Sequence, residues 1–258
     1  MRSVVSKLSV IVITHNEERN IGACLASVRW ADEIVVVDSQ STDRTVELAR
    51  QYTSRVHVNP WMGFAEAKNY ALAQTSADWV LWLDADERVT PELAREIQQV
   101  VRQNRSELVG YSFPRRAYFL GKWIRHCGWY PGRVVRLFRR GAGSFSDSLV
   151  HEHLVLDGSI GRLGHDLLHY TDENLEQYFN KFNRYTSLAV EELVANHRSF
   201  RLLDLLARPP VFFFKMYILR LGFLDGIPGL ILCALSSCYV FTKYAKLWER
   251  SRSLDPDD

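Results

Sequence analysis

The first hundred residues alternate between short apolar runs and amphipathic stretches, and this alternation constrains the fold more than any other feature. Three apolar runs have the length and composition of buried strands: Leu8–Thr14, Glu33–Asp38 and Trp79–Asp84. Stretches with apolar residues at helical spacing lie at 16–30, 45–52, 64–75 and 91–102, and a further short strand is predicted at 55–59. The alternation predicts an α/β fold in which helices cover both faces of a parallel sheet.

The ends of the predicted strands carry polar residues. Thr14, Asp38 and Asp84 each end one of the three apolar runs. In parallel α/β sheets, ligands bind in the crevice beyond the carboxyl ends of the strands. These three side chains are therefore expected to meet at one ligand-binding edge.

The sharpest feature is Asp84-Ala85-Asp86, which closes the third apolar run. Two carboxylates one residue apart present oxygen atoms to one small volume. Hard divalent cations such as Mg²⁺ or Mn²⁺ prefer oxygen ligands and bridge to substrate phosphates, which neutralises the charge of a diphosphate leaving group. Because the triplet also occurs by chance at solvated strand ends, its weight comes from the buried strand before it.

After residue 108 the pattern changes. Short predicted strands at 108–113, 134–138 and 154–156 alternate with glycines and basic residues, which suggests an antiparallel extension, and a helix is predicted over 175–207. The basic residues suit an anionic, phosphorylated partner or form a solvated face. They are Arg115, Arg116, Lys122, Arg125, Arg133, Arg136, Arg139 and Arg140.

The C-terminal part has two apolar runs, Pro209–Phe223 and Ile227–Tyr244, and cations outnumber anions around them. The second run is at the lower limit of the roughly 17–25 residues that span a bilayer, and it contains Pro228 and Lys243. This favours an interfacial or re-entrant helix pair, with cations facing anionic lipid, over a clean transmembrane span. A core helix or a dimer interface is the alternative.

Composition narrows the classes. The chain of 258 residues is 47% hydrophobic and 24% charged, which is an ordinary globular composition, and its net charge of +2 gives no argument for a nucleic-acid partner. The four cysteines lack the spacing of a disulfide framework or a zinc site, so a reducing compartment fits. The first apolar run is too short for a secretory signal.

Four ordered motifs make the first half similar to family 2 glycosyltransferases. They are Ser9–Glu17 (SVIVITHNE), Glu33–Thr45 (EIVVVDSQSTDRT), Ala67–Leu72 (AKNYAL) and Leu83–Glu87 (LDADE). The resemblance implies a GT-A fold, which has a Rossmann-like nucleotide-binding half and a mixed sheet. It also implies a nucleotide-sugar donor, a divalent metal, and usually inversion at the anomeric carbon.

The second half resembles a narrower group, the bacterial lipopolysaccharide core glycosyltransferases that add β-glucose to an inner-core heptose. The matching stretches are Arg136–Arg140 (RLFRR), Val150–Glu152 (VHE), Leu168–Tyr170 (LHY) and Tyr239–Glu249 (YVFTKYAKLWE). The resemblance thus covers nearly the whole chain. Relatives with other acceptors exist, so it points to the class more sharply than to the acceptor.

Roles follow from the resemblance by motif. Thr14, Asn16 and Glu17 would line the nucleoside pocket, and Asp38 would hydrogen-bond the base, taken to be uracil. Lys68 would face the nucleotide, although many relatives carry Arg there. Asp84 would approach the ribose or sugar, and Asp86 would bind the metal. Asp38 and Asp43 are also good turn and helix caps, and capping is the preferred interpretation for Asp43.

An inverting transfer needs a general base for the acceptor hydroxyl. Glu152 is the first candidate and Asp147 the second; the alternative is that Glu152 pairs with Arg133 or Arg136. No H-E-x-x-H zinc motif is present, because His151-Glu152-His153 alternates like a strand. By analogy with the GT-A group, His169 is the candidate to complete the metal site, and the alternative is a buried histidine bonded to backbone.

The sequence therefore predicts a GT-A catalytic domain over 1–175, with a nucleotide-sugar-binding half (1–105) and an acceptor half (106–175), and a helical membrane-associating extension over 176–258. The resemblance implies inverting, metal-dependent transfer of a hexose, glucose first, from a UDP-sugar to a lipopolysaccharide inner-core heptose or a similar lipid-linked glycan. The basic residues would suit a phosphorylated, anionic glycolipid acceptor of this kind. A peripheral or monotopic position at the cytoplasmic face of a bacterial inner membrane is expected. The alternatives are a polyprenyl-phosphate glycosyltransferase and a non-catalytic nucleotide-binding membrane adaptor.

Overall fold

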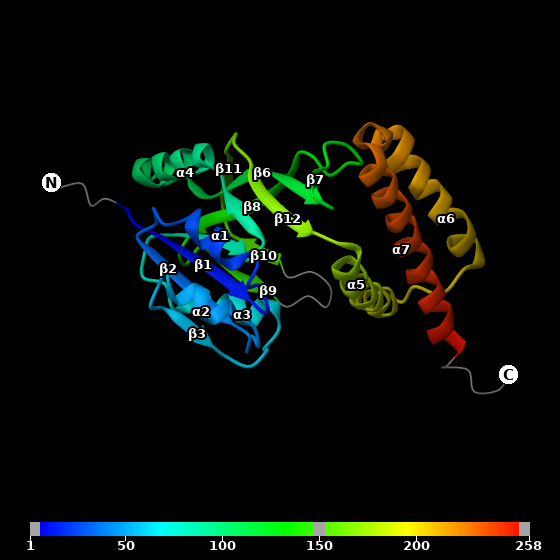
Figure 1. Cartoon of the computed structure of the whole chain (residues 1–258), viewed down its shortest axis with the longest axis horizontal. Helices are drawn as coiled ribbons and strands as arrows, with labels where there is room; N and C mark the ends of the chain where they lie inside the picture. Colours follow the sequence, from blue (N-terminus) through cyan, green and yellow to red (C-terminus); the bar gives the residue numbers. More distant parts are fainter. Residues whose placement is uncertain (1–5, 147–152, 253–258) are drawn as a thin grey trace. The chain divides into compact units, whose positions relative to one another are not determined.

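The fold is seen in a computed structural model, which describes residues 6–146 and 153–252 (Figure 1). The chain divides into two compact units. Unit 1 comprises residues 6–116, 132–146 and 153–169, and unit 2 comprises residues 117–131 and 170–252. The grouping of residues 117–131 with the C-terminal helices was not predicted from the sequence.

Unit 1 is built on a mixed sheet with the strand order β3-β2-β1-β4-β8-β6-β12-β5. The strands β1 (Leu8–Thr14), β2 (Glu33–Asp38), β3 (Val56–Val58) and β4 (Trp79–Asp84) are parallel, as the sequence predicts. The antiparallel extension is also present. In it, β8 (Gly132–Arg139) pairs with β4 and with β6 (Leu108–Phe119), and β12 (Leu167–Asp172) pairs with β5 (Glu87–Val89).

Two shorter pairings complete the strands of unit 1. The strand β11 (Ser159–Arg162) lies parallel to β6, and β9 (Gly143–Ser146) forms a two-stranded antiparallel sheet with β10 (His153–Leu156). The strands β6, β8 and β10 are longer than the three strands that were predicted at 108–113, 134–138 and 154–156.

Helices cover both faces of the parallel strands. They are α1 (Ile21–Ala26), α2 (Thr45–Arg50), α3 (Phe64–Ala73) and α4 (Pro91–Gln103). Along β1, Val10 and Val12 belong to one apolar core and Ile11 to another, because successive strand side chains point to opposite faces. The unbroken apolar run of β1 follows from this burial on both sides.

Unit 2 is mainly helical. It contains β7 (Lys122–Trp123), α5 (Leu175–Ala195), α6 (Leu202–Phe214), a π-helical turn η1 (Lys215–Leu219), a 3₁₀ turn η2 (Gly222–Asp225) and α7 (Gly226–Arg252). Its core joins the segment around β7 to the last helices. The fully buried members of this core are Phe119, Ile124, Cys127, Met216, Leu232 and Cys233.

The prediction of one helix over 175–207 is wrong. The helix α5 ends at Ala195, His197 adopts a left-handed backbone with φ of 54°, and α6 begins at Leu202. Asn and His tolerate this conformation better than most residues, so Asn196-His197 can turn the chain. The helix predicted over 16–30 is likewise short, because Asn16 has φ of 54° and α1 begins only at Ile21.

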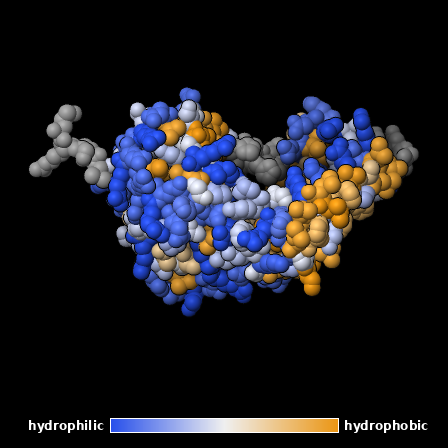
Figure 2. All heavy atoms as spheres, turned by 90° about the horizontal axis from the view of Figure 1, so that it is seen from above, coloured by the Kyte–Doolittle hydropathy of each residue, from blue (hydrophilic) through white to orange (hydrophobic). Residues whose placement is uncertain are grey.

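The surface of unit 2 is unusually apolar, and Figure 2 shows this apolar surface gathered over the C-terminal helices. Large hydrophobic side chains are exposed on α6, on α7 and on the turns η1 and η2 between them, among them Leu203, Leu206, Leu219, Leu224 and Ile227. One helix in the described residues, Gly222–Arg252, is long and apolar enough to cross a membrane, and most of its apolar stretch is not buried.

Candidate active site at the carboxyl edge of the sheet

The predicted meeting of the strand ends is observed in unit 1. In the register of the sheet, Thr14 lies beside Asp38, and Ile13 lies beside Asp84. The carboxyl ends of β1, β2 and β4 therefore form one edge. The parallel pairing, which buries each strand on both faces, is what brings residues from three separate motifs to it.

Asp84 is held between two cations of the same unit. Arg136 Nη2 donates to Asp84 Oδ2 at 2.7 Å, and Lys68 Nζ lies 3.8 Å from Asp84 Oδ1. Burial alone would raise the pKa of this carboxyl group, but the charges of Arg136 and Lys68 outweigh it and lower the pKa to about 2. Asp84 is therefore ionised throughout the physiological range.

Glu87 and Arg136 form a buried ion pair behind Asp84. Arg136 Nη2 donates to Glu87 Oε1 at 2.6 Å, and Glu87 Oε2 accepts a hydrogen bond of 3.1 Å from the backbone N–H of Asp84. Glu87 is fully buried; burial raises its pKa, and Arg136 opposes the rise. Neither residue was predicted as part of the site. Arg136 was considered as one of the basic residues, in the Arg136–Arg140 stretch and as an alternative partner of Glu152, and Glu87 only as the end of the Leu83–Glu87 motif.

Lys68 and Arg136 also share an aromatic platform. Lys68 Nζ lies 3.9 Å, and the guanidinium carbon of Arg136 3.4 Å, from the ring centroid of Trp82. Trp82 is oriented by its own indole N–H, which donates to the backbone oxygen of Val135 at 3.1 Å. A weakly hydrated guanidinium stacks well on an aromatic face, so the platform stabilises both cations next to Asp84.

Asp86 faces His169, the residue proposed by analogy as its partner. Asp86 Oδ2 lies 3.4 Å from His169 Nε2, and the pairing of β5 with β12 brings the two together by setting His169 beside Glu87. His169 Nδ1 is buried and makes no hydrogen bond within the described residues. One carboxylate and one imidazole fit a divalent cation that takes its other ligands from phosphate and water.

No group of three or more His, Cys, Asp or Glu side chains converges as a cation site in residues 6–146 and 153–252. This agrees with the way Mg²⁺ is commonly bound, through one or two carboxylates plus substrate oxygens rather than a complete protein cage. The residues of the Asp84-Ala85-Asp86 turn thus fit a metal that arrives with a diphosphate.

The loops after β1 and β2 are joined by hydrogen bonds. Asn16 Oδ1 accepts from the backbone N–H of Thr42 at 2.8 Å, and the backbone N–H of Glu17 donates to Thr45 Oγ1 at 2.8 Å. The Glu17 carboxylate accepts from Asn20 Nδ2 at 3.0 Å. Asn16 and Glu17 therefore help to shape the loops at this edge, and their place in a nucleoside pocket stays a prediction.

Thr14 and Asp38 differ in what their side chains contact. The Asp38 carboxylate is fully buried and accepts from both the backbone N–H (2.8 Å) and the hydroxyl of Ser41. Thr14 Oγ1 is also buried but has no hydrogen-bond partner in the described part of the chain. Since buried hydroxyl groups are normally bonded, Thr14 has spare capacity for a ligand.

Asp43 is a capping residue, as the sequence analysis preferred. Its Oδ1 accepts from the backbone N–H of Thr45 at 2.9 Å and from the Thr45 hydroxyl, and its Oδ2 accepts from the backbone N–H of Glu18 at 3.1 Å. Burial would raise the pKa of Asp43, but the hydrogen bonds from Thr45 and Glu18 together outweigh it and lower the pKa.

The two candidate bases, Glu152 and Asp147, lie outside the described residues, as does His151. The residues that flank this segment, Ser146 and His153, belong to unit 1 and pair with each other across β9 and β10. Next to Ser146, the backbone of Phe145 is bonded at both N–H and C=O to the Asn69 side chain (2.9 and 2.7 Å). The Phe145 ring makes an edge contact with the Trp82 ring, with the ring centroids 5.3 Å apart, so Phe145 lies next to the Lys68–Arg136 platform.

The basic residues of the extension do not form a free belt, because most make internal contacts. In unit 1, Arg116 pairs with Asp166, and Arg133, Arg139 and Arg140 donate to backbone oxygens. In unit 2, Lys122 Nζ donates to the backbone oxygen of Asp225 at 2.7 Å. Many of these cations therefore stabilise the fold. This role differs from both predicted ones, which were binding of an anionic partner and formation of a solvated face.

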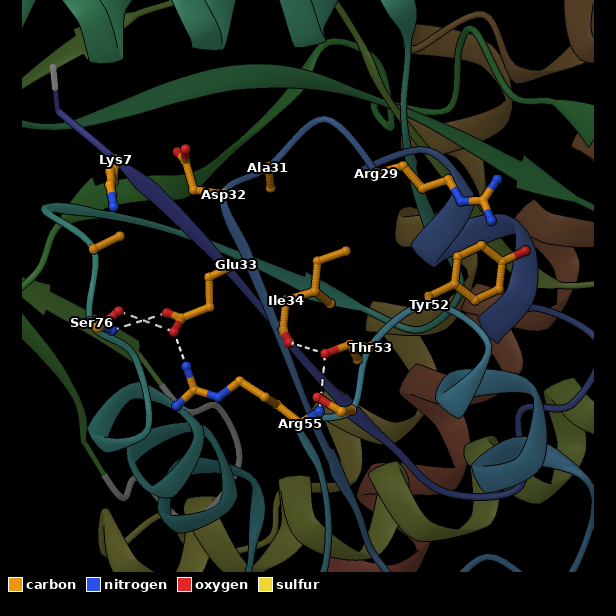
Figure 3. A pocket seen from close by; sticks show the side chains of 12 residues that line it. Lys7, Arg29, Ala31, Asp32, Glu33, Ile34, Tyr52, Thr53, Arg55 and Ser76 are labelled. Carbon is orange, nitrogen blue, oxygen red and sulfur yellow. Dashed lines mark hydrogen bonds and ion pairs between the residues drawn. The ribbon is translucent and has the colours of Figure 1, made fainter.

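A cavity of about 680 Å³ lies elsewhere in unit 1, near the amino ends of β1 and β2, and is lined by Lys7, Arg29, Asp32, Tyr52 and Arg55 among others (Figure 3). Its most central charged groups are already paired, because Glu33 contacts both Arg55 and Ser76. Ligands of parallel sheets bind at the opposite, carboxyl ends. The Asp84-Ala85-Asp86 edge is therefore the candidate site.

Comparisons with known proteins show the family of the chain. Residues 9–154 match the family described as Glycosyl transferase family 2. The chain is 34% identical over 251 residues to the lipopolysaccharide core biosynthesis glycosyltransferase LpsC of Rhizobium meliloti (strain 1021), covering 94% of this chain and 92% of that protein. It is 30% identical over 258 residues to the uncharacterized glycosyltransferase RT0209 of Rickettsia typhi (strain ATCC VR-144 / Wilmington), covering 96% and 88%.

Among solved structures, the chain is similar to the mannosyltransferase PcManGT from Pyrobaculum calidifontis in complex with GDP-Man and Mn²⁺. The TM-score is 0.56 at 16% identity, over 95% of this chain and 88% of that one. The fold is thus that of the GT-A glycosyltransferases. The chain belongs to glycosyl transferase family 2 and is a glycosyltransferase.

Proposed function

We propose that the chain is an inverting, metal-dependent transferase that moves a hexose, glucose in the first instance, from a UDP-sugar to a lipopolysaccharide inner-core heptose or a similar lipid-linked glycan. The observation that carries the proposal is the carboxyl edge itself, where ionised Asp84 and the Asp86–His169 pair adjoin the cations Lys68 and Arg136. Such an edge suits a donor that combines hydroxyl groups with a metal-bound diphosphate.

Each residue has a role in this proposal. Thr14, Asn16, Glu17 and Asp38 line the nucleoside pocket, with Asp38 directed to the base. Asp84 accepts hydrogen bonds from the ribose or sugar hydroxyls, and Lys68 faces the phosphates. Asp86 and His169 hold the Mg²⁺ or Mn²⁺ ion, which supplies charge neutralisation for the departing diphosphate.

Glu152 is the proposed general base, with Asp147 as the second candidate. A base at hydrogen-bond distance from the acceptor hydroxyl takes its proton as that oxygen attacks the anomeric carbon and the diphosphate leaves. The contacts of the Phe145 ring with Trp82 and Lys68 support a base from the segment that follows it. The acceptor class is supported by the likeness to a lipopolysaccharide core biosynthesis glycosyltransferase.

The acceptor is lipid-linked, and the apolar surface of unit 2 supports action at the cytoplasmic face of the inner membrane as a peripheral or monotopic protein. The contacts of α7 favour an interfacial position over a span. Its C-terminal half is bonded to α5, since Lys246 Nζ donates to the Asn183 and Thr186 oxygens and Tyr239 donates to the backbone oxygen of Tyr185. The helix α5 also exposes charged residues such as Lys181 and Glu191, which a bilayer core would have to desolvate.

One experiment tests the reaction. The full-length protein is incubated with UDP-, GDP- and ADP-sugars, Mg²⁺ or Mn²⁺, and purified core lipopolysaccharide, and the products are read by mass spectrometry. We expect a gain of one hexose that depends on a UDP-sugar and is lost with EDTA. Transfer from every donor class alike, or undiminished transfer in EDTA, would contradict the proposal.

A second experiment tests the membrane surface alone. Cys238 is exposed on α7, whereas Cys24, Cys127 and Cys233 are buried, so a thiol-reactive, environment-sensitive fluorophore reports on one position. Its emission should shift to the blue with vesicles that contain phosphatidylglycerol, and less with neutral vesicles. Unchanged emission with both vesicles would remove the interfacial position of α7.

A further inference from the structure

Two arginines of β8 stack on two tryptophans of β4, and the two pairs are otherwise very different. The antiparallel register sets Trp79 beside Arg139 and Leu81 beside Leu137. The guanidinium carbon of Arg139 lies 4.5 Å from the Trp79 ring centroid, and that of Arg136 lies 3.4 Å from Trp82. The same spacing, Trp-x-x-Trp against Arg-x-x-Arg, thus yields one pair at the site edge and one at the amino end of β4.

Arg139 is saturated by neutral acceptors. Its Nε donates to the backbone oxygen of Leu108 at 2.9 Å, and its terminal nitrogens donate to Asn104 Oδ1 and the backbone oxygen of Arg105 at 2.7 and 2.8 Å. These acceptors close the loop between α4 and β6. Arg139 therefore serves the fold.

Arg136 is bonded in the opposite way. A single nitrogen, Nη2, donates to both carboxylates, Asp84 and Glu87, while Nε is buried without a hydrogen-bond partner among the described residues. Arg136 is also more deeply buried than Arg139, with 4% of its surface exposed. An arginine that served only the fold would be expected to use its remaining donors.

Glu87 explains how this cation can be buried. It neutralises Arg136, is approached by Arg115 at 3.8 Å, and accepts the backbone N–H of Asp84, which sets the shape of the Asp84-Ala85-Asp86 turn. Arg136 then bridges from this internal anion to the ligand-facing carboxylate. It also occupies the Oδ2 side of Asp84, while Lys68 occupies the Oδ1 side.

We propose that Arg136 is a positioning residue for the sugar-nucleotide donor. Through Nη2 it fixes the orientation of the Asp84 carboxylate, so that Asp84 is preorganised for donor hydroxyls before the donor arrives. Arg136 does not touch the reacting atoms in this assignment; it acts through Asp84. The inference rests on the proposed function, in which Asp84 binds the ribose or sugar.

The test measures binding of UDP with Mg²⁺ by calorimetry. Arg136→Gln alone would leave Glu87 buried without its main counter-ion, so the informative variant is the neutral pair Glu87→Gln/Arg136→Gln. We expect its UDP affinity to fall about tenfold to hundredfold, the range for loss of one hydrogen bond between charged groups. Glu87→Gln alone should lose less, because Arg136 still reaches Asp84, and Arg136→Lys should recover part of the loss.

Arg139→Gln is the matched control, since it removes the same residue type from the same strand. It should lower the thermal midpoint while leaving UDP affinity within about twofold. In steady-state assays with a UDP-sugar, the double variant should raise the donor KM more than it lowers kcat, because an interaction made equally in ground and transition states affects binding.

Several results would overturn the inference. A folded double variant that binds UDP as tightly as the wild type would do so, as would Glu87→Gln alone causing the full loss. If the double variant does not fold, Arg136→Lys decides: wild-type affinity in that variant contradicts the need for the two-carboxylate geometry of arginine. Failure of the wild-type protein to bind UDP, GDP or ADP with either metal would instead contradict the proposed function.

Discussion

The two units depart from the ordinary pattern of a soluble protein in opposite directions. Unit 1 buries charge: Lys68, Glu87 and Arg136 are all nearly inaccessible to solvent. Unit 2 exposes hydrophobic surface, and it holds most of the exposed large hydrophobic side chains among the described residues. Each departure is unfavourable for folding alone, because buried ions lose hydration and exposed apolar patches favour association.

The difference between the units suits them to different kinds of ligand. Buried, paired charge at a strand edge gives fixed dipoles for a small polar ligand, since ions held by the fold need not reorganise when the ligand arrives. An apolar surface gives no such direction, and it suits a partner that is itself broad and apolar. Under the proposed function, the first arrangement would serve the sugar-nucleotide donor and the second a membrane surface.

The strongest way to break the unit 1 side of this comparison is Asp86→Asn. Replacing the carboxylate with an amide removes the negative charge that the cation needs, so transfer should fall at least about a thousandfold while the fold persists. Calorimetric titration with Mn²⁺ and UDP should show the metal-dependent part of binding lost. Asp157→Asn, at an exposed position, is the control; full activity in Asp86→Asn would remove the metal role.

The next largest effect is expected from Glu152→Gln. Loss of a general base lowers turnover by about a hundredfold to ten-thousandfold and leaves donor binding in place. Turnover and UDP affinity are measured in parallel with those of Asp147→Asn. Should Asp147→Asn be the slower variant, the base is Asp147; should Glu152→Gln weaken UDP binding, the residue belongs to the donor pocket.

The unit 2 side is tested by Leu224→Asn/Ile227→Asn, which makes the turn η2 and the first residues of α7 polar. Both side chains are more than half exposed (55% and 73%), so folding loses little, whereas two apolar anchors are lost to the lipid. Binding to vesicles that contain phosphatidylglycerol, read by flotation, should weaken about tenfold or more. The unit 1 pair Val155→Asn/Ile160→Asn, also exposed, should leave flotation unchanged.

Substitutions at the Leu224 and Ile227 positions are used instead of a truncation, because Met216, Leu232 and Cys233 belong to the core of unit 2. A truncation would lose that core as well as the apolar surface. Flotation of the polar variant at the wild-type level would show that the turn is not a lipid anchor.

The smallest effect sharpens the comparison within unit 1. Thr14→Val removes the buried hydroxyl that has no partner in the described residues and keeps the shape of the side chain. The free energy of unfolding should rise by about 1 kcal/mol, while UDP affinity falls several-fold. Thr45→Val should instead destabilise, because that hydroxyl bonds both Glu17 and Asp43. Denaturant unfolding and UDP titration check the two; a Thr14→Val variant that loses stability would assign the hydroxyl to the fold.

Much of the carboxyl edge of the sheet, where the candidate site lies, could be predicted from the sequence. The strands β1, β2 and β4 end at the residues where their apolar runs end, and Thr14, Asp38 and Asp84 meet as the parallel pattern requires. The capping of α4 was also predictable, since Thr90 accepts from the backbone N–H of Leu93 and Pro91 begins the helix. These features are encoded within short windows of the chain, where periodicity and residue type act locally.

The remaining features depend on distant parts of the chain. Asp225 is buried in unit 2, and its carboxylate accepts hydrogen bonds from the backbone N–H groups of Arg125 and His126, about a hundred positions away in the chain. No pattern in the sequence around Asp225 indicates these contacts. The break between α5 and α6 was missed because hydrophobic spacing continues through it, while the left-handed His197 leaves no periodic signal.

The sequence by itself determined the family, the class of reaction and the acidic turn, because each is carried by contiguous residues whose chemistry does not depend on their surroundings. Only the tertiary structure decided how that turn is held. In the sequence, Arg136 cannot be distinguished from the seven other cations of the extension. The register of β4 against β8 places it on the Trp82 ring, where it pairs with both Asp84 and Glu87. The physical reason is that the energy of a charge depends on its burial and its neighbours, which are properties of the folded chain.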